Sequence, residues 1–246
     1  MIMIGRKRIT WLGGMVLLAM LCFTFQSAKL EENAVAVPTV ALPVTNRVIV
    51  LDAGHGKPDE GAQSSRGTTE AETNLKIAKK LQNLLEQSGA TVILTRSDEN
   101  AIYDAEESSL RQKKVSDIHN RVRIGNESSA DIFVSIHLNK IPQQQYWGWQ
   151  CFYQLGNDKS IKLAKSVQNN LNEAIQRENK RVPMKLDNVY IMKHVEIPTT
   201  IVECGFLSNP EEEQMLLEDT YQEKLAWGIY NGIMEYFCEN ENKSND

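Results

Sequence analysis

The chain has 246 residues, of which 41% are apolar and 24% charged, a composition typical of a globular protein with a core rather than of a disordered one. Its formal net charge is −5, and because residues 1–25 carry only basic charges, the remainder is more acidic still. Such an acidic body argues against nucleic acid as a partner, since phosphates require a basic surface.

The beginning of the chain has the features of an export signal. Arg6-Lys7-Arg8 precede an uncharged, apolar stretch from Ile9 to Phe25, the order of basic and apolar regions found in such signals. The stretch is at the lower limit of length for spanning a bilayer. We therefore expect residues 1–27 to be a signal peptide or an uncleaved signal anchor that exports the rest across the cytoplasmic membrane. Residues 28–45 are expected to be a linker.

Beyond the linker, short apolar segments alternate with amphipathic ones. The first of the amphipathic segments, Glu70–Ser88, has Leu75, Leu81 and Leu85 at helical spacing. The expected strands are Val48–Asp52, Thr91–Thr95, Asp131–His137, Trp149–Gln154, Val189–Met192 and Thr199–Glu203, and the further expected helices are Leu110–Ser128, Asp158–Arg177 and Tyr221–Phe237. This alternation predicts one α/β domain at residues 46–238, with a mixed, mostly parallel β-sheet flanked by helices on both faces.

Three cysteines lie between the N-terminal segment and the end of the chain, namely Cys151, Cys204 and Cys238. An odd number without a CxxC spacing favours free thiols. Cys204 follows an apolar segment and is expected to be a small hydrophobic residue rather than a nucleophile. Residues 239–246 are expected to form a disordered tail.

A histidine or a glutamate stands at the carboxyl end of three of these apolar segments. They are His55, His137 and Glu203. Ligands and chemistry collect at the carboxyl ends of strands in an open α/β sheet. Two histidines, a carboxylate and an open position for water form an established type of catalytic zinc site. The sequence therefore predicts zinc-assisted hydrolysis.

The third zinc ligand must be an acid close to His55. The candidates are Asp52, Asp59, Glu60, Glu70 and Glu72. Glu70 has the best position, because it opens the first helix directly after the glycine-rich loop at 54–67. The alternative is that Glu70 only complements the positive end of that helix, and the residues alone do not decide between the two roles.

Glu203 has a different expected role. It follows two β-branched residues, so a strand would carry its carboxylate to the edge of the sheet. Beside an activated water it could accept the proton and return it to a leaving amine. The alternative is a salt bridge to Arg96 or Arg121.

Six segments carry a resemblance to a known family. They are Leu51-Asp52-Ala53-Gly54-His55-Gly56, Glu70 five residues before Leu75, Leu94-Thr95-Arg96, Arg121 with Asn126, Ser135-Ile136-His137-Leu138-Asn139, and Val202-Glu203-Cys204-Gly205-Phe206-Leu207-Ser208-Asn209. In this order and spacing, over residues 46–238, they resemble the zinc-dependent N-acetylmuramoyl-L-alanine amidases of amidase type 3.

The resemblance implies a phosphorylase/hydrolase-like amidase fold and peptidoglycan as the substrate. It implies Zn²⁺ as the cofactor, with His55, Glu70 and His137 as ligands and Glu203 as the catalytic acid/base. It thereby favours the ligand role of Glu70. Within that site, Asn139 and Arg121 are expected to orient the substrate or support the ligands, unless both are only structural hydrogen-bonding residues.

Further segments resemble the sporulation amidases of spore-forming Gram-positive bacteria. They are Gly148–Tyr153, Val189–His194 and Tyr221–Ala226. Enzymes of that subgroup strip the peptide from muramic acid, so that a partner deacetylase can form the muramic-δ-lactam of spore cortex. The resemblance implies a location between the forespore and mother-cell membranes.

The chain departs from the family pattern in two places beside the expected metal site. Ala71 stands where a lysine is common, and Lys57-Pro58 follow Gly56 in place of a further glycine. We expect a changed pocket shape or metal affinity, and dependence on an accessory protein.

The sequence is also compatible with two other functions. One is a non-catalytic module that binds peptidoglycan or a partner protein. The other is a zinc carboxypeptidase, which would use Arg66, Arg96 or Arg121 to hold a terminal carboxylate.

Overall fold

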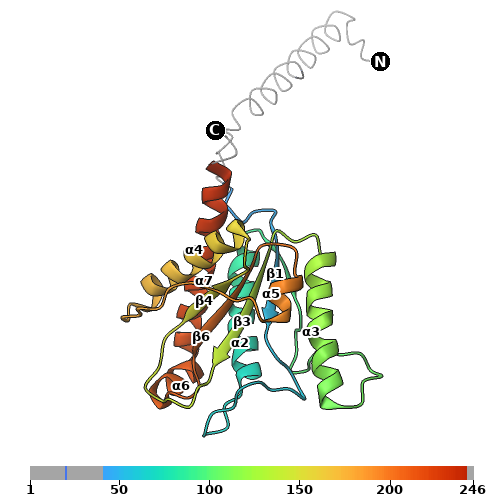
Figure 1. Ribbon diagram of the computed structural model, residues 1–246. Coiled ribbons are helices and arrows are strands. Elements are labelled where there is room, and N and C mark those ends of the chain that lie inside the picture. The colour runs from blue at the N-terminus through green and yellow to red at the C-terminus, as the bar shows by residue number, and fades with distance from the viewer. Residues whose placement is uncertain (1–19, 21–40, 243–246) are drawn as a thin grey trace, which may run out of the picture. The chain divides into compact units, whose positions relative to one another are not determined.

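The computed structural model describes Met20 and residues 41–242 (Figure 1). The expected signal segment, apart from Met20, lies outside the described residues, as do most of the expected linker and the last four residues of the expected tail. Among the helices of the described residues, none is long and apolar enough to cross a membrane.

The described chain forms a sheet of six strands. They are β1 (Val48–Ala53), β2 (Thr91–Leu94), β3 (Ile132–Asn139), β4 (Gln150–Tyr153), β5 (Met184–Lys185) and β6 (Thr199–Phe206), in the order β2-β1-β3-β6-β4-β5. The first four in that order are parallel, β4 is antiparallel to β6, and β5 is parallel to β4. The expected mixed, mostly parallel sheet is confirmed.

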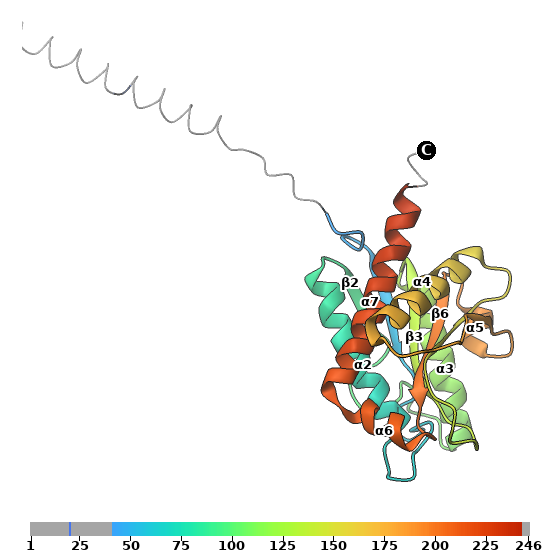
Figure 2. The same cartoon turned by 90° about the vertical axis from the view of Figure 1, so that its left-hand side faces the viewer.

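Helices cover both faces of the sheet, as expected (Figures 1 and 2). They are α2 (Glu70–Gln87), α3 (Leu110–Glu127), α4 (Asp158–Ile175), α5 (Tyr190–His194), α6 (Pro210–Leu217) and α7 (Asp219–Asn242). The larger core lies between the sheet and α2, α4 and α7. A smaller core, which includes Val50, Val122 and Phe133, lies under α3 and α5 on the opposite face. The single α/β domain is therefore built as a three-layer structure.

The helices begin where the sequence offers hydrogen-bond acceptors to free backbone N–H groups. Thr69 accepts from the N–H of Glu72 at the start of α2, and Asn157 accepts from Ser160 at the start of α4. Ser109 forms a reciprocal capping box with Gln112 at the start of α3. The start of α2 matters most for function, because its first residue is Glu70.

The expected strand at Val189–Met192 is wrong, because residues Tyr190–His194 form the one-turn helix α5. The neighbours Ile191 and Met192 are both buried, whereas a half-buried strand would alternate buried and exposed residues. A short apolar run does not distinguish a strand from a buried helical turn by periodicity.

The three cysteines of the described chain are free thiols, as expected.

Two elements were not expected, β5 and α6. The first is only two residues long, but α6 had a clear start signal. Asn209 accepts from the N–H groups of Glu211 and Glu212, and Pro210 and three glutamates occupy the first turn. The closing helix α7 is also longer than expected, since it continues to Asn242, four residues into the expected tail.

The close packing of α7 on α4 depends on a glycine. A Cβ atom at Gly232 would lie 2.4 Å from Cα of Val167, which is backbone and cannot rotate away. We therefore predict that Gly232→Ala lowers the free energy of unfolding by about 1–3 kcal/mol, although alanine is the better helix former.

Urea denaturation would measure this loss. Lys224→Ala, at an exposed position of the same helix, is the control and should change stability by less than about 0.5 kcal/mol. Equal stability of the two variants would contradict the proposed backbone contact.

Candidate active site

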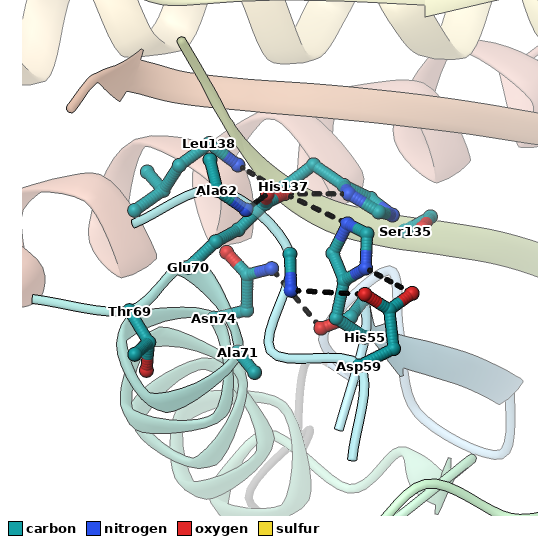
Figure 3. A network of polar contacts seen from close by, with 12 residues as sticks. His55, Asp59, Ala62, Thr69, Glu70, Ala71, Asn74, Ser135, His137 and Leu138 are labelled. Carbon is teal, nitrogen blue, oxygen red and sulfur yellow. Dashed lines mark hydrogen bonds and ion pairs between the residues drawn. The ribbon is translucent and has the colours of Figure 1, made fainter. Parts of the chain in front are cut away.

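His55, Glu70 and His137 meet at the carboxyl ends of β1 and β3 (Figure 3). One ligand atom from each side chain lies within 4.8 Å of the others. Oε1 of Glu70 lies 2.8 Å from Nδ1 of His137 and 3.3 Å from Nε2 of His55. These three residues form a group that could hold a metal ion.

Of the other acids near His55, Asp59 also contacts it, on the side of the imidazole ring opposite Glu70. Its Oδ2 lies 3.3 Å from Nδ1 of His55, the ring nitrogen that does not face Glu70. Asp59 in turn pairs with Lys114 at 2.9 Å and accepts from the N–H of Gly61. A carboxylate in this position orients a metal-binding histidine and raises its basicity.

The charges around His55, Glu70 and His137 favour a positive charge at this site. Burial opposes a charge on His55, but hydrogen bonds to Asp59 and Glu70 outweigh it and raise the pKa of His55 to about 9. Burial likewise opposes ionisation of Glu70, yet the two histidines hold its pKa well below the usual range. Glu70 also accepts from the backbone N–H groups of Ala62 and Leu138, which fixes its orientation.

The glycine before His55 is required by its contact with the second histidine. A Cβ atom at Gly54 would lie 2.2 Å from Nε2 of His137, so the imidazole packs directly on the backbone of the loop. His55 itself has a φ of 64°, a left-handed conformation that is uncommon outside glycine. Such strained backbone persists only where its surroundings hold it in place.

Arg121 provides that support. Its guanidinium donates to the carbonyl oxygens of Ala53 and His55 and forms a 2.5 Å ion pair with the fully buried Asp52. Its Nε donates a hydrogen bond to a second carboxylate, that of Asp117. Arg121 is 2% exposed, so it lies beneath the His55 loop and supports the loop rather than facing solvent.

Glu203 lies beside His137 in the sheet, since the two residues are register partners on β6 and β3. Its Oε2 is buried and has no hydrogen-bond partner among the described residues. Burial raises the pKa of Glu203 to about 7. A carboxyl group with a pKa near neutrality can both accept and donate a proton under ordinary conditions.

The alternative salt bridge from Glu203 to an arginine is wrong. Arg96 donates to the carbonyl oxygens of Ala53, Gly54, Ala71 and Asp98. Arg121 is committed to Asp52 and Asp117, as described above. Within the described chain neither arginine pairs with Glu203.

Asn139 lies at the end of β3, two residues after His137 and beside a shift of register between β3 and β6. Its backbone carbonyl accepts from Leu207 at 2.8 Å. The residue is half-buried. The position is compatible with contact to a substrate.

The two departures from the family pattern share one cavity. Lys57 and Ala71 both line a space of about 360 Å³ next to the Glu70 helix. Glu60, Glu72 and Glu99 line it too, and Lys57 pairs with Glu99 at 2.8 Å. The charged residues of the cavity wall are therefore three glutamates and one lysine.

Comparison with known proteins agrees with this geometry. A family model described as N-acetylmuramoyl-L-alanine amidase matches residues 49–235. The germination-specific N-acetylmuramoyl-L-alanine amidase of Bacillus subtilis (strain 168) is 34% identical over 234 residues, covering 95% of this chain and 97% of the relative.

Solved structures give the same result. The CwlD amidase from Clostridioides difficile, solved in complex with the GerS lipoprotein, is 43% identical with a TM-score of 0.77, covering 79% of this chain and 100% of that one. An N-acetylmuramoyl-L-alanine amidase from Clostridium difficile 630 is 31% identical with a TM-score of 0.67, covering 78% and 97%. The resemblance to this family and to its sporulation amidases, noted from the sequence, is confirmed. This chain belongs to the N-acetylmuramoyl-L-alanine amidase family and is a hydrolase of that class.

Proposed function

We propose that the amidase depends on a zinc ion held by His55, Glu70 and His137, with Glu203 as the catalytic acid/base. The observation that carries the proposal is the convergence of these three ligand atoms within 4.8 Å beside a buried carboxylate that has an unpartnered oxygen. Two histidines and a glutamate are a known set for catalytic zinc. Asp59 supplies the outer carboxylate that such sites commonly contain.

The reaction is hydrolysis of the amide bond between the lactyl group of muramic acid and L-alanine in peptidoglycan. Zinc, when bound, polarises a carbonyl group and lowers the pKa of water. Glu203 accepts a proton from the attacking water through its free Oε2 and then donates it to the departing alanine nitrogen. In this proposal Asn139 orients the substrate, while Arg121 keeps the His55 loop in place.

The carboxypeptidase alternative finds no support in the arginines it would need. Arg96 and Arg121 are buried and bonded to backbone carbonyls and carboxylates. Arg66 lies 3.9 Å from the buried carboxylate of Glu213. Arg96 and Arg121 are therefore not free to receive a terminal carboxylate.

We further propose the cellular setting implied by the relatives. The B. subtilis relative is germination-specific, and the C. difficile CwlD amidase forms a complex with a lipoprotein. By analogy, this chain acts outside the cytoplasmic membrane, between the forespore membranes, after export by its N-terminal segment. It works with an accessory lipoprotein and precedes a deacetylase that completes the muramic-δ-lactam.

The proposed proton transfer predicts that Glu203→Gln lowers the rate of amide cleavage by about 10²–10⁴-fold while zinc content stays normal. Mass spectrometry of digested peptidoglycan measures the rate as the appearance of free lactyl carboxylates on muramic acid. Glu218→Gln, at an exposed position, is the control. A zinc-loaded Glu203→Gln protein with wild-type activity would refute the mechanism.

The contact between Asp59 and His55 predicts that Asp59→Asn weakens zinc binding by about 10–100-fold. Competition with a chromogenic chelator measures this without reference to activity. Lys114→Ala removes the exposed partner of Asp59 but keeps the carboxylate, and should change zinc affinity less than about threefold. Unchanged affinity in Asp59→Asn would show that the contact does not support the metal.

The raised pKa of His55 predicts how the metal-free protein responds to pH. A histidine whose pKa is raised from 6.5 to about 9 in the folded state stabilises the fold below pH 6.5 and loses that contribution as the pH rises through 9. Melting in the presence of a chelator should therefore occur at lower temperature at pH 9 than at pH 6.5. His55→Gln should show a smaller decrease, and an equal decrease would contradict the assignment.

A further inference from the structure

A row of polar side chains continues across the sheet beyond the catalytic pair. Glu203 on β6 has two register partners, His137 on β3 and Gln150 on the antiparallel strand β4. Side chains of directly paired residues point to the same face of a sheet. His137, Glu203 and Gln150 therefore lie in a row on the face that carries the active site.

Arg181 extends this row. Its Nη1 donates to Oε1 of Gln150 at 3.3 Å and its Nε donates to the carbonyl of Trp147 at 3.4 Å. The guanidinium lies over the ring of Phe206 at 4.7 Å and within 5.9 Å of the ring of Tyr146. Because β4 is two strand spacings from β3, the backbone of Gln150 lies about 10 Å from that of His137.

The loop that carries Arg181 is anchored on both sides of the arginine. Asn179 donates to the carbonyl of Trp149 at 2.8 Å and accepts from the N–H of Arg181. The amide of Gln150 donates to the carbonyl of Val182 at 2.9 Å. A cation held this firmly is preorganised, so little entropy is lost when a ligand binds to it.

Arg181 differs from the neighbouring cations in its lack of an ion pair. Lys180 pairs with Glu178 and Lys185 with Asp187. The described residues place no carboxylate within 4.0 Å of Arg181. Glu212 interacts with it electrostatically, but the two oxygens of Glu212 accept from the backbone N–H groups of Phe206 and Gly148.

The arginine also opens onto a space large enough for a ligand. A cavity of about 430 Å³ is lined by Tyr146, Trp147, Asn179 and Arg181, together with Glu178 and Lys180. A half-buried guanidinium stacked on aromatic rings is weakly hydrated and matches the geometry of a carboxylate. The guanidinium is thus suited to bind an anionic group.

We propose that Arg181, positioned by Gln150 and Phe206, binds a carboxylate of the stem peptide and so sets the direction in which peptidoglycan lies across the site. The inference rests on the proposed amidase reaction. The substrate has a sugar half with neutral rings and a peptide half that is acidic, and a cation selects the acidic half. About 10 Å corresponds to three residues of extended peptide, so the carboxylates of the second and third residues come within reach.

Binding of two muramyl tripeptides would test the proposal, one with free peptide carboxylates and one with the same carboxylates amidated. Zinc-loaded Glu203→Gln protein serves as the background, so that the ligands stay intact during calorimetric titration. We expect this protein to bind the free acid about tenfold more tightly than the amide, and Arg181→Ala to remove the difference. Arg181→Lys should retain part of it, and Lys185→Ala, at an exposed lysine outside the cavity lining, all of it.

The possible results distinguish the proposed amidase function from the proposed role of Arg181. Binding of neither tripeptide would count against the proposed function itself. Binding of both without discrimination, or discrimination that survives in Arg181→Ala, would overturn only the role of Arg181. If Arg181→Ala lost affinity equally for the free acid and the amide, Arg181 would have a structural role. The same would follow if a neutral disaccharide bound more tightly than the tripeptides and its binding also depended on Arg181.

Discussion

The ion pair between Asp52 and Arg121 is the interaction on which the rest of the site depends. Asp52 is fully buried at the end of β1 and also accepts from Ser135 on β3 and from Thr95 after β2. Arg121 reaches it from α3 and holds the carbonyl of His55. Removing one partner of a buried pair leaves an uncompensated charge, which typically destabilises a protein by about 3–5 kcal/mol. The pair thus joins three strands and a helix beneath the strained histidine.

Around this pair, the site contains features that a purely structural arrangement would avoid. His55 has a left-handed backbone, the His137 ring lies against bare backbone at Gly54, and Glu203 has a buried oxygen without a partner. Buried unsatisfied polar atoms and strained dihedrals each oppose folding by about 1–3 kcal/mol. Their concentration within one group of residues is what a site for metal binding and proton transfer requires.

The sheet also explains how a long substrate could reach this group. On the active-site face, α3 contacts β1, while the antiparallel β4 extends the sheet on the other side of β6. The residues after α4 fold back onto β4 and bring Arg181 to the end of the polar row. The proposed catalytic residues thus come from the parallel strands, and the proposed binding surface is extended by the antiparallel part of the sheet.

The sequence by itself determined the strand ends, the stripe of α2 and therefore the positions of His55, His137, Glu203 and Glu70. Local periodicity and β-branched runs carry that information, since they depend only on near neighbours along the chain. Tertiary structure alone decided the rest. Asp59 lies in an irregular loop without periodicity. The helical turn α5 buries Ile191 and Met192 and contacts α3, and Arg181 joins the row through a register set between distant strands. Burial and pairing between residues far apart in sequence decide these features, and no local pattern encodes them.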